Sequence, residues 1–477
     1  MASSISGDDL DYWQLRKDVS QIIPRQSVLS GDGRADKVRL KEKGRKSNYH
    51  QFNVHSGEMV KLERLLSTEG LNSFVEVSLR AQSCPMPLNL DLYDGLKCPY
   101  GCKYCFADYF RHSLYTGFFD NSKSMGLRHG DPERYKAELA PLLAHRGEPV
   151  SGENDIVNAF RLGIPLRFGI RFEDFTAQEK RIGLSLSVLE YLSDAGYPVM
   201  INTKSDLPAE GPYLRALADN KGRSAIHFTL ISSDEPFLHK VEPGAPTFAR
   251  RLAAAKLLVD AGVRVVARIE PWMVFLNDSK DMVDDYIGQI KDAGIRHLTL
   301  DSYSYSAKGN GLAENFKKMG MDFDRMFLLS SDSQGLSSLL LGKFMEYFRA
   351  QGLQASTFDQ GNVPGNEDWI CCSVGDWFEG FNWGSGVIAV KFIKEAAGRV
   401  VRWSDFDRFV VQKGGGLSSK LRHEVHLLWN SEGDAAWHLG WAAGMIPSGY
   451  DEDGVLWRWD AQDDFRLTTY NNLKKEI

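Results

Sequence analysis

The sequence predicts an α/β fold in which parallel strands alternate with helices and curve into a partial barrel. Between about residues 85 and 305, six short β-rich runs alternate with stretches whose apolar residues recur every three or four positions. Three of the helical stretches end at a glycine that leads directly into the next run, at Gly196, Gly262 and Gly294. Six such units predict a (β/α)6 TIM-like partial barrel, with ligands at the carboxyl ends of its strands.

The same pattern predicts the individual elements. We expect strands at Leu88–Leu92, Leu166–Ile170, Val199–Thr203, Ile226–Ile231, Val263–Ile269 and His297–Leu300. We expect helices at Ala177–Ala195, Pro212–Asp219, Thr247–Ala261 and Lys280–Ala293.

Three regions are predicted along the chain. Residues 1–80 form an N-terminal extension of polar and irregular pattern, with one amphipathic helix expected near Glu58–Leu66. Residues 81–305 form the barrel core. The alternation then fades, and residues 306–477, which are rich in Trp, Gly and Asp, form a C-terminal α+β region that could bind the substrate.

The composition of the 477 residues is that of a globular protein, with 43% hydrophobic and 25% charged residues. No apolar run reaches the roughly 18 residues of a membrane span, and the N-terminus lacks the pattern of a secretory signal. We therefore expect a cytoplasmic protein, or one in the host cytoplasm if a phage encodes it.

The net charge of −6 gives no overall basic field, but residues 34–46 are locally basic. That stretch is either a solvated surface segment or a phosphate contact.

Three of the six cysteines fall within eight residues, in the order Cys98-Pro-Tyr-Gly-Cys102-Lys-Tyr-Cys105. This C-x3-C-x2-C run directly follows the first expected strand. Three thiolates in one short loop can hold three irons of a [4Fe–4S] cluster and leave the fourth iron open to another ligand. A zinc site is the alternative, but it would need a fourth Cys or His at matching spacing, and the nearest is His112.

This motif resembles that of the radical S-adenosylmethionine (SAM) superfamily. The resemblance implies that Cys98, Cys102 and Cys105 hold the cluster, and that SAM binds its open iron and is cleaved to a 5′-deoxyadenosyl radical. It also implies that Tyr104, the aromatic residue before the last cysteine, packs on the adenine. An electron donor such as flavodoxin or ferredoxin would reduce the cluster.

The middle of the chain is similar to one branch of that superfamily, the spore photoproduct lyase and DNA repair photolyase-like proteins. The segments that carry this similarity are residues 168–179, 201–205, 228–235, 241–246 and 265–271, in the order found in the family. By position, Lys204 and Ser205 should meet SAM, with the lysine paired to its carboxylate. The other expected SAM contacts are Ser232, Ser233, Glu173, Asp174, Glu179, Arg268 and Glu270. Each of these side chains could instead form a salt bridge or a helix cap.

Two features depart from the spore photoproduct lyase pattern. Phe106 stands where that family has a tyrosine, and no cysteine lies between Cys105 and Cys371 to donate a hydrogen atom. Cys371 or Cys372 could fill that catalytic role from the C-terminal region. Without such a donor, 5′-deoxyadenosine can return the hydrogen atom, which suits an isomerase. The resemblance then extends to phage enzymes of thymidine hypermodification, which rearrange a modified thymine within DNA.

We therefore expect a radical SAM enzyme that acts on a thymine-derived base in DNA, with rearrangement favoured. Alternatives are a spore-photoproduct-lyase-like repair lyase, a radical SAM enzyme on a peptide or small metabolite, and a cluster-containing binding protein without turnover. Aromatic residues around Cys371 and Cys372, between residues 368 and 383, either stack on an extruded base or form a packed core.

Overall fold

The computed structural model describes part of the chain. The described residues are 10–29, 59–61, 76–79, 88–94, 98–105, 128–144, 146, 147, 150, 153, 155–170, 172–220, 222–303, 316, 318–321, 336–357, 373, 374, 377, 386–412, 422, 426, 429, 430, 445–460 and 465–475.

A nine-stranded sheet organises the molecule, and seven of its strands are parallel neighbours. In spatial order these are β3 (Leu88–Leu90), β6 (Leu166–Phe168), β7 (Val199–Thr203), β8 (Ser224–Thr229), β9 (Arg264–Trp272), β10 (His297–Ser302) and β11 (Gln354–Thr357). The predicted α/β class and the six predicted strands are confirmed. The seventh strand, β11, lies beyond residue 305, where the pattern no longer predicts one.

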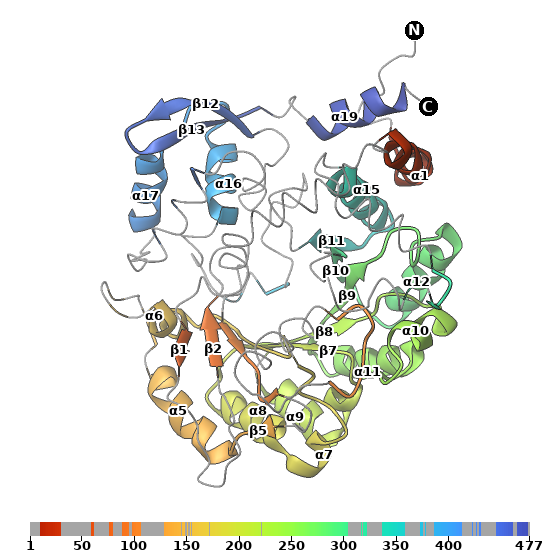
Figure 1. The fold of residues 1–477 in the computed structure, drawn as a ribbon. Helices are drawn as coiled ribbons and strands as arrows, with labels where there is room; N and C mark the ends of the chain where they lie inside the picture. The colour runs from red at the N-terminus through yellow and green to blue at the C-terminus, as the bar shows by residue number, and fades with distance from the viewer. Residues whose placement is uncertain are drawn as a thin grey trace, which may run out of the picture.

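Helices cover one side of this sheet (Figure 1). Along the chain they are α5 (Pro132–Ala144), α6 (Asp155–Arg161), α7 (Glu179–Ile182), α8 (Leu184–Asp194), α9 (Gly211–Asp219), α10 (Glu235–Val241), α11 (Phe248–Asp260), α12 (Lys280–Asp292) and α15 (Leu336–Ala350), with a 3-10 turn at Leu207–Ala209. The two-residue strands β4 (Tyr93–Asp94) and β5 (Arg128–His129) pair antiparallel. Gly196, Gly262 and Gly294 follow α8, α11 and α12 with φ of 59°, 80° and 83°, which confirms the predicted glycine helix ends.

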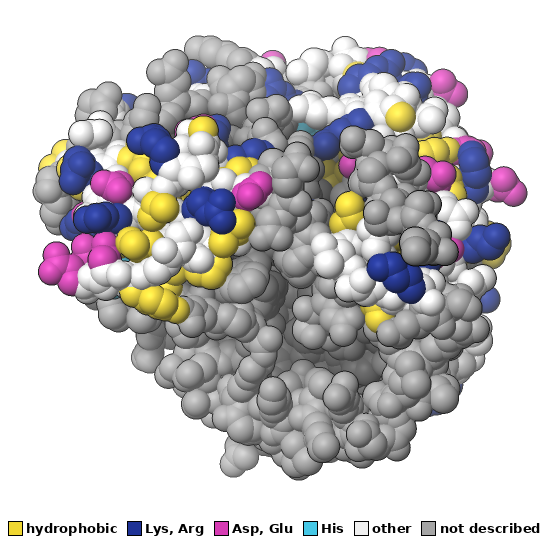
Figure 2. All heavy atoms as spheres, turned by 90° about the horizontal axis from the view of Figure 1, so that it is seen from above, with side chains coloured by type: hydrophobic (Ala, Val, Ile, Leu, Met, Phe, Trp, Pro, Cys, Tyr) yellow, Lys and Arg dark blue, Asp and Glu magenta, His cyan; other side chains and the backbone are white. Residues whose placement is uncertain are grey.

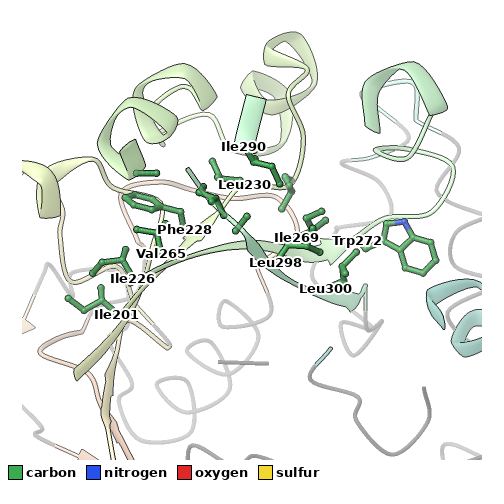
Figure 3. Close-up of a cluster of buried hydrophobic side chains, with 14 of the residues drawn as sticks. Ile201, Ile226, Phe228, Leu230, Val265, Ile269, Trp272, Ile290, Leu298 and Leu300 are labelled. Atoms are coloured by element: carbon green, nitrogen blue, oxygen red, sulfur yellow. The ribbon is translucent and has the colours of Figure 1, made fainter. Parts of the chain in front are cut away.

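The core lies between the sheet and these helices. Alternate strand residues point into it, including Ile201, Phe228, Ile269 and Leu298, all at most 4% exposed (Figure 3). The intervening strand residues, such as Asn202 and Thr299, belong to the opposite face of the sheet and are nevertheless buried. Burial on both faces explains why the strands read as continuous runs in the sequence.

Helix α1 (Tyr12–Leu29) packs on α15 together with α19 (Phe465–Lys474), although the three are distant in sequence. Tyr12 stacks on Phe344 of α15, with 4.4 Å between the ring centroids. The sequence-based prediction missed α1, even though Tyr12, Leu15, Val19 and Ile22 recur at helical spacing and are all buried.

A second, smaller core belongs to the C-terminal region. It joins α16 (Gly386–Glu395), α17 (Trp403–Gln412) and the antiparallel hairpin of β12 (Met445–Asp451) and β13 (Gly454–Trp459). Phe406 stacks on Trp429 at 5.5 Å, and Trp429 and Trp457 are fully buried. These residues form an α+β unit, as the sequence predicts for this part of the chain.

The prediction of an amphipathic helix near Glu58–Leu66 is wrong for the three residues of it that the structure describes. Met59–Lys61 is instead strand β1, which pairs antiparallel with β2 (Glu76–Leu79) next to β3. Hydrogen bonds to a neighbouring strand outweigh the weak helical preference of a short segment. None of the described helices is long and apolar enough to cross a membrane.

Candidate functional site

The three clustered cysteines lie in a loop at residues 98–105, which we call the cluster loop. It follows β3 and β4, at the carboxyl end of the first parallel strand. The amide of Gly101 donates to the carbonyl of Cys98 at 3.1 Å, and the amide of Cys105 donates to the carbonyl of Cys102 at 3.4 Å. None of the three cysteines is in a disulfide, and each is partly buried. These turns bring the three cysteines into one short loop.

The spacing of these thiols bears on the kind of metal group that they could hold. Among the described residues, no three His, Cys, Asp or Glu side chains converge on a position for a single metal ion. A [4Fe–4S] cluster does not require such convergence, because each thiolate then binds a different iron. Three cysteines at this spacing suit an iron–sulfur cluster with one open iron, whereas a structural zinc site would use a fourth Cys or His.

Tyr104, within the cluster loop, faces Lys204. Tyr104 is 8% exposed, and the ammonium of Lys204 lies 5.5 Å from the centroid of its ring. Burial by itself lowers the pKa of Lys204, but the nearby Cys102 and Glu242 raise it above its ordinary value. The structure thus brings together two residues that the sequence analysis selected separately.

The Lys204 ammonium forms no ion pair within the part of the chain that the structure describes, although Cys102 and Glu242 lie near enough to favour its charge. Lys204 directly follows β7, and its backbone amide donates to Glu173 at 2.9 Å. Its ammonium makes no ion pair with any described carboxylate, in contrast to the many Lys and Arg side chains that do. Removing a charge from water without a partner is costly, so a lysine in this state is suited to bind an anionic group.

Two adjacent buried carboxylates, Glu173 and Asp174, hold the backbone around the site in place. Glu173 accepts hydrogen bonds from Thr203 Oγ1 at 2.7 Å and from the amides of Lys204 and Phe175. Asp174 accepts from the amides of Leu92, Tyr93 and Gly169 and so joins the ends of β3 and β6. Burial raises the pKa of both carboxyls, and for Asp174 the neighbouring Asp91 and Glu173 add to this.

Glu179 is fully buried and accepts from four donors: the hydroxyls of Tyr93 and Tyr213 and the amides of Ser185 and Leu186. With Asp174 it therefore stabilises the fold around the site. Whether either carboxylate also binds SAM stays a prediction.

The other predicted SAM contacts are engaged with the protein itself. Ser205 accepts from the amide of Leu207 at 3.1 Å. Ser232 donates to Met282 Sδ at 3.0 Å and Ser233 to the carbonyl of Met282 at 3.4 Å, so both hydroxyls face α12. Arg268 and Glu270, on β9, form an ion pair with each other. A role of these side chains toward SAM stays a prediction.

The face of the sheet that turns away from the helices carries polar atoms without partners. Asn202 Oδ1, His297 Nδ1 and Thr299 Oγ1 are buried and make no hydrogen bond with any described residue. Burial and the nearby Arg264 lower the pKa of His297 to about 3, so its imidazole is neutral. The sequence analysis missed these residues; the signal was their alternation with the apolar residues of the core. Buried polar atoms of this kind need an explanation, and a bound ligand is one.

Cys371, Cys372, Phe106 and His112 lie outside the described residues. Next to the cysteine pair, the carbonyl of Ser373 accepts a hydrogen bond from Arg264, and the Arg264 guanidinium lies 4.9 Å from the ring centroid of Trp377. Arg264 begins β9, so this contact lies at the amino end of the strand. The cluster loop lies at the opposite, carboxyl end of the sheet.

Comparisons with known proteins give limited similarity. No family model matches the chain. Uncharacterized proteins of Mycobacterium tuberculosis (strain ATCC 25618 / H37Rv) and Mycobacterium bovis are each 27% identical over 225 residues, or 46% of this chain. The chain spans 59% of the length of these relatives.

Two solved structures have a partly similar backbone trace. A spore photoproduct lyase mutant with bound AdoMet and dinucleoside spore photoproduct has a TM-score of 0.42 and 12% identity, over 59% of this chain and 79% of that one. Streptococcus suis SuiB bound to S-adenosylmethionine has a TM-score of 0.38 and 12% identity, over 58% of this chain and 51% of that one. Because both scores are below 0.5, the function proposed below is based on the residues of the chain itself.

Proposed function

We propose that this chain is a radical SAM enzyme that uses a [4Fe–4S] cluster. The observation that carries the proposal is the position of Lys204, which forms no ion pair with a described carboxylate and lies beside the Tyr104 ring and the cysteines of the cluster loop. The amino and carboxylate groups of SAM can bind the open iron of such a cluster, and a lysine without an ion pair among the described residues suits the carboxylate. When bound, the cluster and SAM supply a 5′-deoxyadenosyl radical.

The residues of the chain then have separate roles. Cys98, Cys102 and Cys105 hold the cluster. Lys204 binds the SAM carboxylate, and Glu173 fixes the backbone from which Lys204 extends. Tyr104 offers its buried ring as a surface for the adenine.

The test is anaerobic reconstitution with iron and sulfide. We expect about four irons per chain and formation of 5′-deoxyadenosine from SAM under reducing conditions. Cys98→Ala, Cys102→Ala and Cys105→Ala should each abolish that product. As a control, Cys84→Ala, which removes a thiol outside the motif, should leave it intact. A wild-type protein that binds zinc but no iron and forms no 5′-deoxyadenosine would contradict the proposal.

For the substrate, we propose a thymine-derived base in DNA, and rearrangement as the reaction. The sequence has no cysteine between Cys105 and Cys371 to quench a product radical. This long gap in the sequence favours hydrogen return from 5′-deoxyadenosine. The partnerless Asn202 Oδ1 and Thr299 Oγ1 suit a substrate with hydrogen-bonding edges, such as a base.

Surface charge gives this substrate little support from the described residues. Figure 2 shows Lys and Arg side chains interspersed with Asp and Glu on the described part of one face. The basic stretch at residues 34–46 lies outside the described residues, and in our proposal it supplies the phosphate contacts.

An isotope experiment separates rearrangement from lyase repair. DNA that carries a modified thymidine deuterated at the reacting carbon should pass its label through 5′-deoxyadenosine and back into the product, without net consumption of SAM. Cys371→Ala and Cys372→Ala should keep this turnover. If SAM is consumed once per product, or if either substitution diverts the product radical, the cysteine pair is the donor and repair is favoured.

A further inference from the structure

We propose that Glu242 and Arg251 are positioning residues for the cluster loop: they fix the Tyr104 ring against Lys204 and thereby set the affinity for SAM. This inference rests on the radical SAM function proposed above. Neither residue was selected by the sequence analysis, although Glu242 belongs to one of the segments that carry the family resemblance. Glu242 contacts Tyr104 of the cluster loop, and Arg251 contacts Glu242.

The end of α10 and the loop that follows it, residues 242–247, are bound to the cluster loop through the backbone. The amide of Lys103 donates to the carbonyl of Val241 at 2.8 Å, and the amide of Gly244 donates to the carbonyl of Tyr100 at 3.0 Å. The approach is so close that a Cβ on Gly244 would lie 2.4 Å from the carbonyl oxygen of Pro99. Glycine is therefore needed there. The two loops form one unit of backbone.

Glu242 connects this unit to the Tyr104 side chain. It is 3% exposed, and its two carboxylate oxygens have different partners: Oε1 accepts from the Tyr104 hydroxyl and Oε2 from Arg251. The carboxylate is thus held in one orientation, and the phenol ring has a fixed end. A charged acceptor makes this hydrogen bond stronger than a neutral one.

Arg251 connects the same unit to the sheet. It is 1% exposed and, besides Glu242, donates to the carbonyls of Pro246 and Thr229, each at 2.7 Å. Thr229 is the last residue of β8. One guanidinium therefore links a strand end, helix α11 and, through Glu242, the ring of Tyr104. The planar fork of arginine allows this set of contacts, and the single ammonium of lysine does not.

The functional consequence lies at Lys204, whose ammonium is 5.5 Å from the centroid of the Tyr104 ring. If the ring moves, the site that receives the adenine and the lysine that receives the carboxylate lose their relative position. Glu242 and Arg251 would then affect SAM binding without touching SAM. Residues that orient the residues around a metal site commonly act in this way.

The experiment compares Arg251→Lys with Arg250→Lys, its neighbour on the same helix. Arg250 forms an exposed ion pair with Asp206 and serves as the matched control. On reconstituted protein we would measure the iron content, the Kd for SAM by calorimetry, and the electron paramagnetic resonance spectrum of the reduced cluster with and without SAM. Glu242→Gln and Tyr104→Phe complete the series.

Arg251→Lys and Glu242→Gln should keep the iron of the wild type but weaken SAM binding by about 10- to 100-fold. They should also change the spectral shift that SAM induces. Arg250→Lys should match the wild type. Unchanged affinity and spectra in both variants would overturn the inference and leave the radical SAM proposal intact, whereas a wild type without iron would overturn both.

If Arg251→Lys and Glu242→Gln fail to fold, Tyr104→Phe decides the matter, because it removes only the hydroxyl that Glu242 holds. The inference then requires weaker SAM binding in Tyr104→Phe, by roughly threefold or more for the loss of one hydrogen bond. An affinity equal to that of the wild type would refute it.

Discussion

Two parts of the molecule bury charged side chains in opposite ways. Where α1 meets the loop before α12, the fully buried Asp278 accepts two hydrogen bonds from Arg16, both at 2.9 Å, and a third from Tyr12. At the carboxyl end of the sheet, Lys204 has no ionic partner among the described carboxylates, and Glu173 is held by backbone amides and one hydroxyl. In the first region the charges are paired with each other, whereas in the second the Lys204 ammonium has no described carboxylate as its partner.

This difference teaches how to distinguish a charge that stabilises the fold from one that binds a ligand. A buried charge with a complete set of partners is part of the structure, and its removal should cost stability. A cation without a partner gains its partner only when a ligand binds, so its removal should cost affinity instead. The following predictions test whether the two regions separate in this way.

The largest expected effect belongs to Asp278. Asp278→Ala leaves Arg16 and Tyr12 without their shared acceptor, so the free energy of unfolding should fall by about 3–5 kcal/mol. Urea denaturation measures this loss. Asp260→Ala, which breaks an exposed pair with Lys256, is the control and should change stability by less than about 0.5 kcal/mol. Similar effects of the two substitutions would remove the structural half of the comparison.

Lys204→Met should lower the affinity for SAM and leave stability nearly unchanged, the opposite of Asp278→Ala. It removes the charge and keeps most of the apolar stem, so SAM binding should weaken by about 1.5–3 kcal/mol, the value of a charge-assisted contact. Stability and iron content should change little. Calorimetric titration with SAM measures the effect, with Lys256→Met as the control. An unchanged Kd for SAM would mean that Lys204 does not bind its carboxylate, and the comparison would fail at the ligand site.

The smallest expected effect is the pH dependence of stability that comes from His297, on the face of the sheet that turns away from the helices. His297 has a pKa lowered to about 3 by burial and by Arg264. At pH 5 an unfolded histidine takes up a proton that the folded one refuses, so its contribution to stability is present above about pH 6.5 and is lost as the pH falls toward 3. Between pH 7 and pH 5 the wild type should lose about 2 kcal/mol more than His297→Gln. Denaturation curves that change in parallel would contradict this.

Much of the barrel could be predicted because its strands are buried on both faces. Val199–Thr203 is found with the predicted bounds, and β8, β9 and β10 differ from theirs by at most three residues at either end. Strand β11 escaped prediction because Gln354–Thr357 has no apolar run of its own and is a strand through its pairing with β10. Pairing across the chain is a tertiary effect that local pattern does not contain.

The candidate site was also predictable where the signal is local in sequence and not where it depends on tertiary contacts. The three cysteines and Tyr104 could be chosen because their spacing is local and their chemistry is specific. The sequence could not show that Glu242 meets Tyr104, 138 positions away, or that Asp174 uses both of its oxygens on backbone amides. Polar residues at strand ends look alike in sequence. Only their hydrogen-bond partners in the folded protein distinguish a residue that stabilises the fold from one that binds a ligand.

Helix α1 has a consequence for the synthesis of the protein. Its Tyr12 stacks on Phe344, and its Asp18 binds Tyr470 and Lys474 of α19, across 452 and 456 positions. At a translation rate of roughly 15 residues per second, α1 leaves the ribosome on the order of half a minute before α19 exists. Until α15 and then α19 have been synthesised, α1 lacks the two helices on which it packs. The first described helix of the chain is therefore among the last to reach its native place.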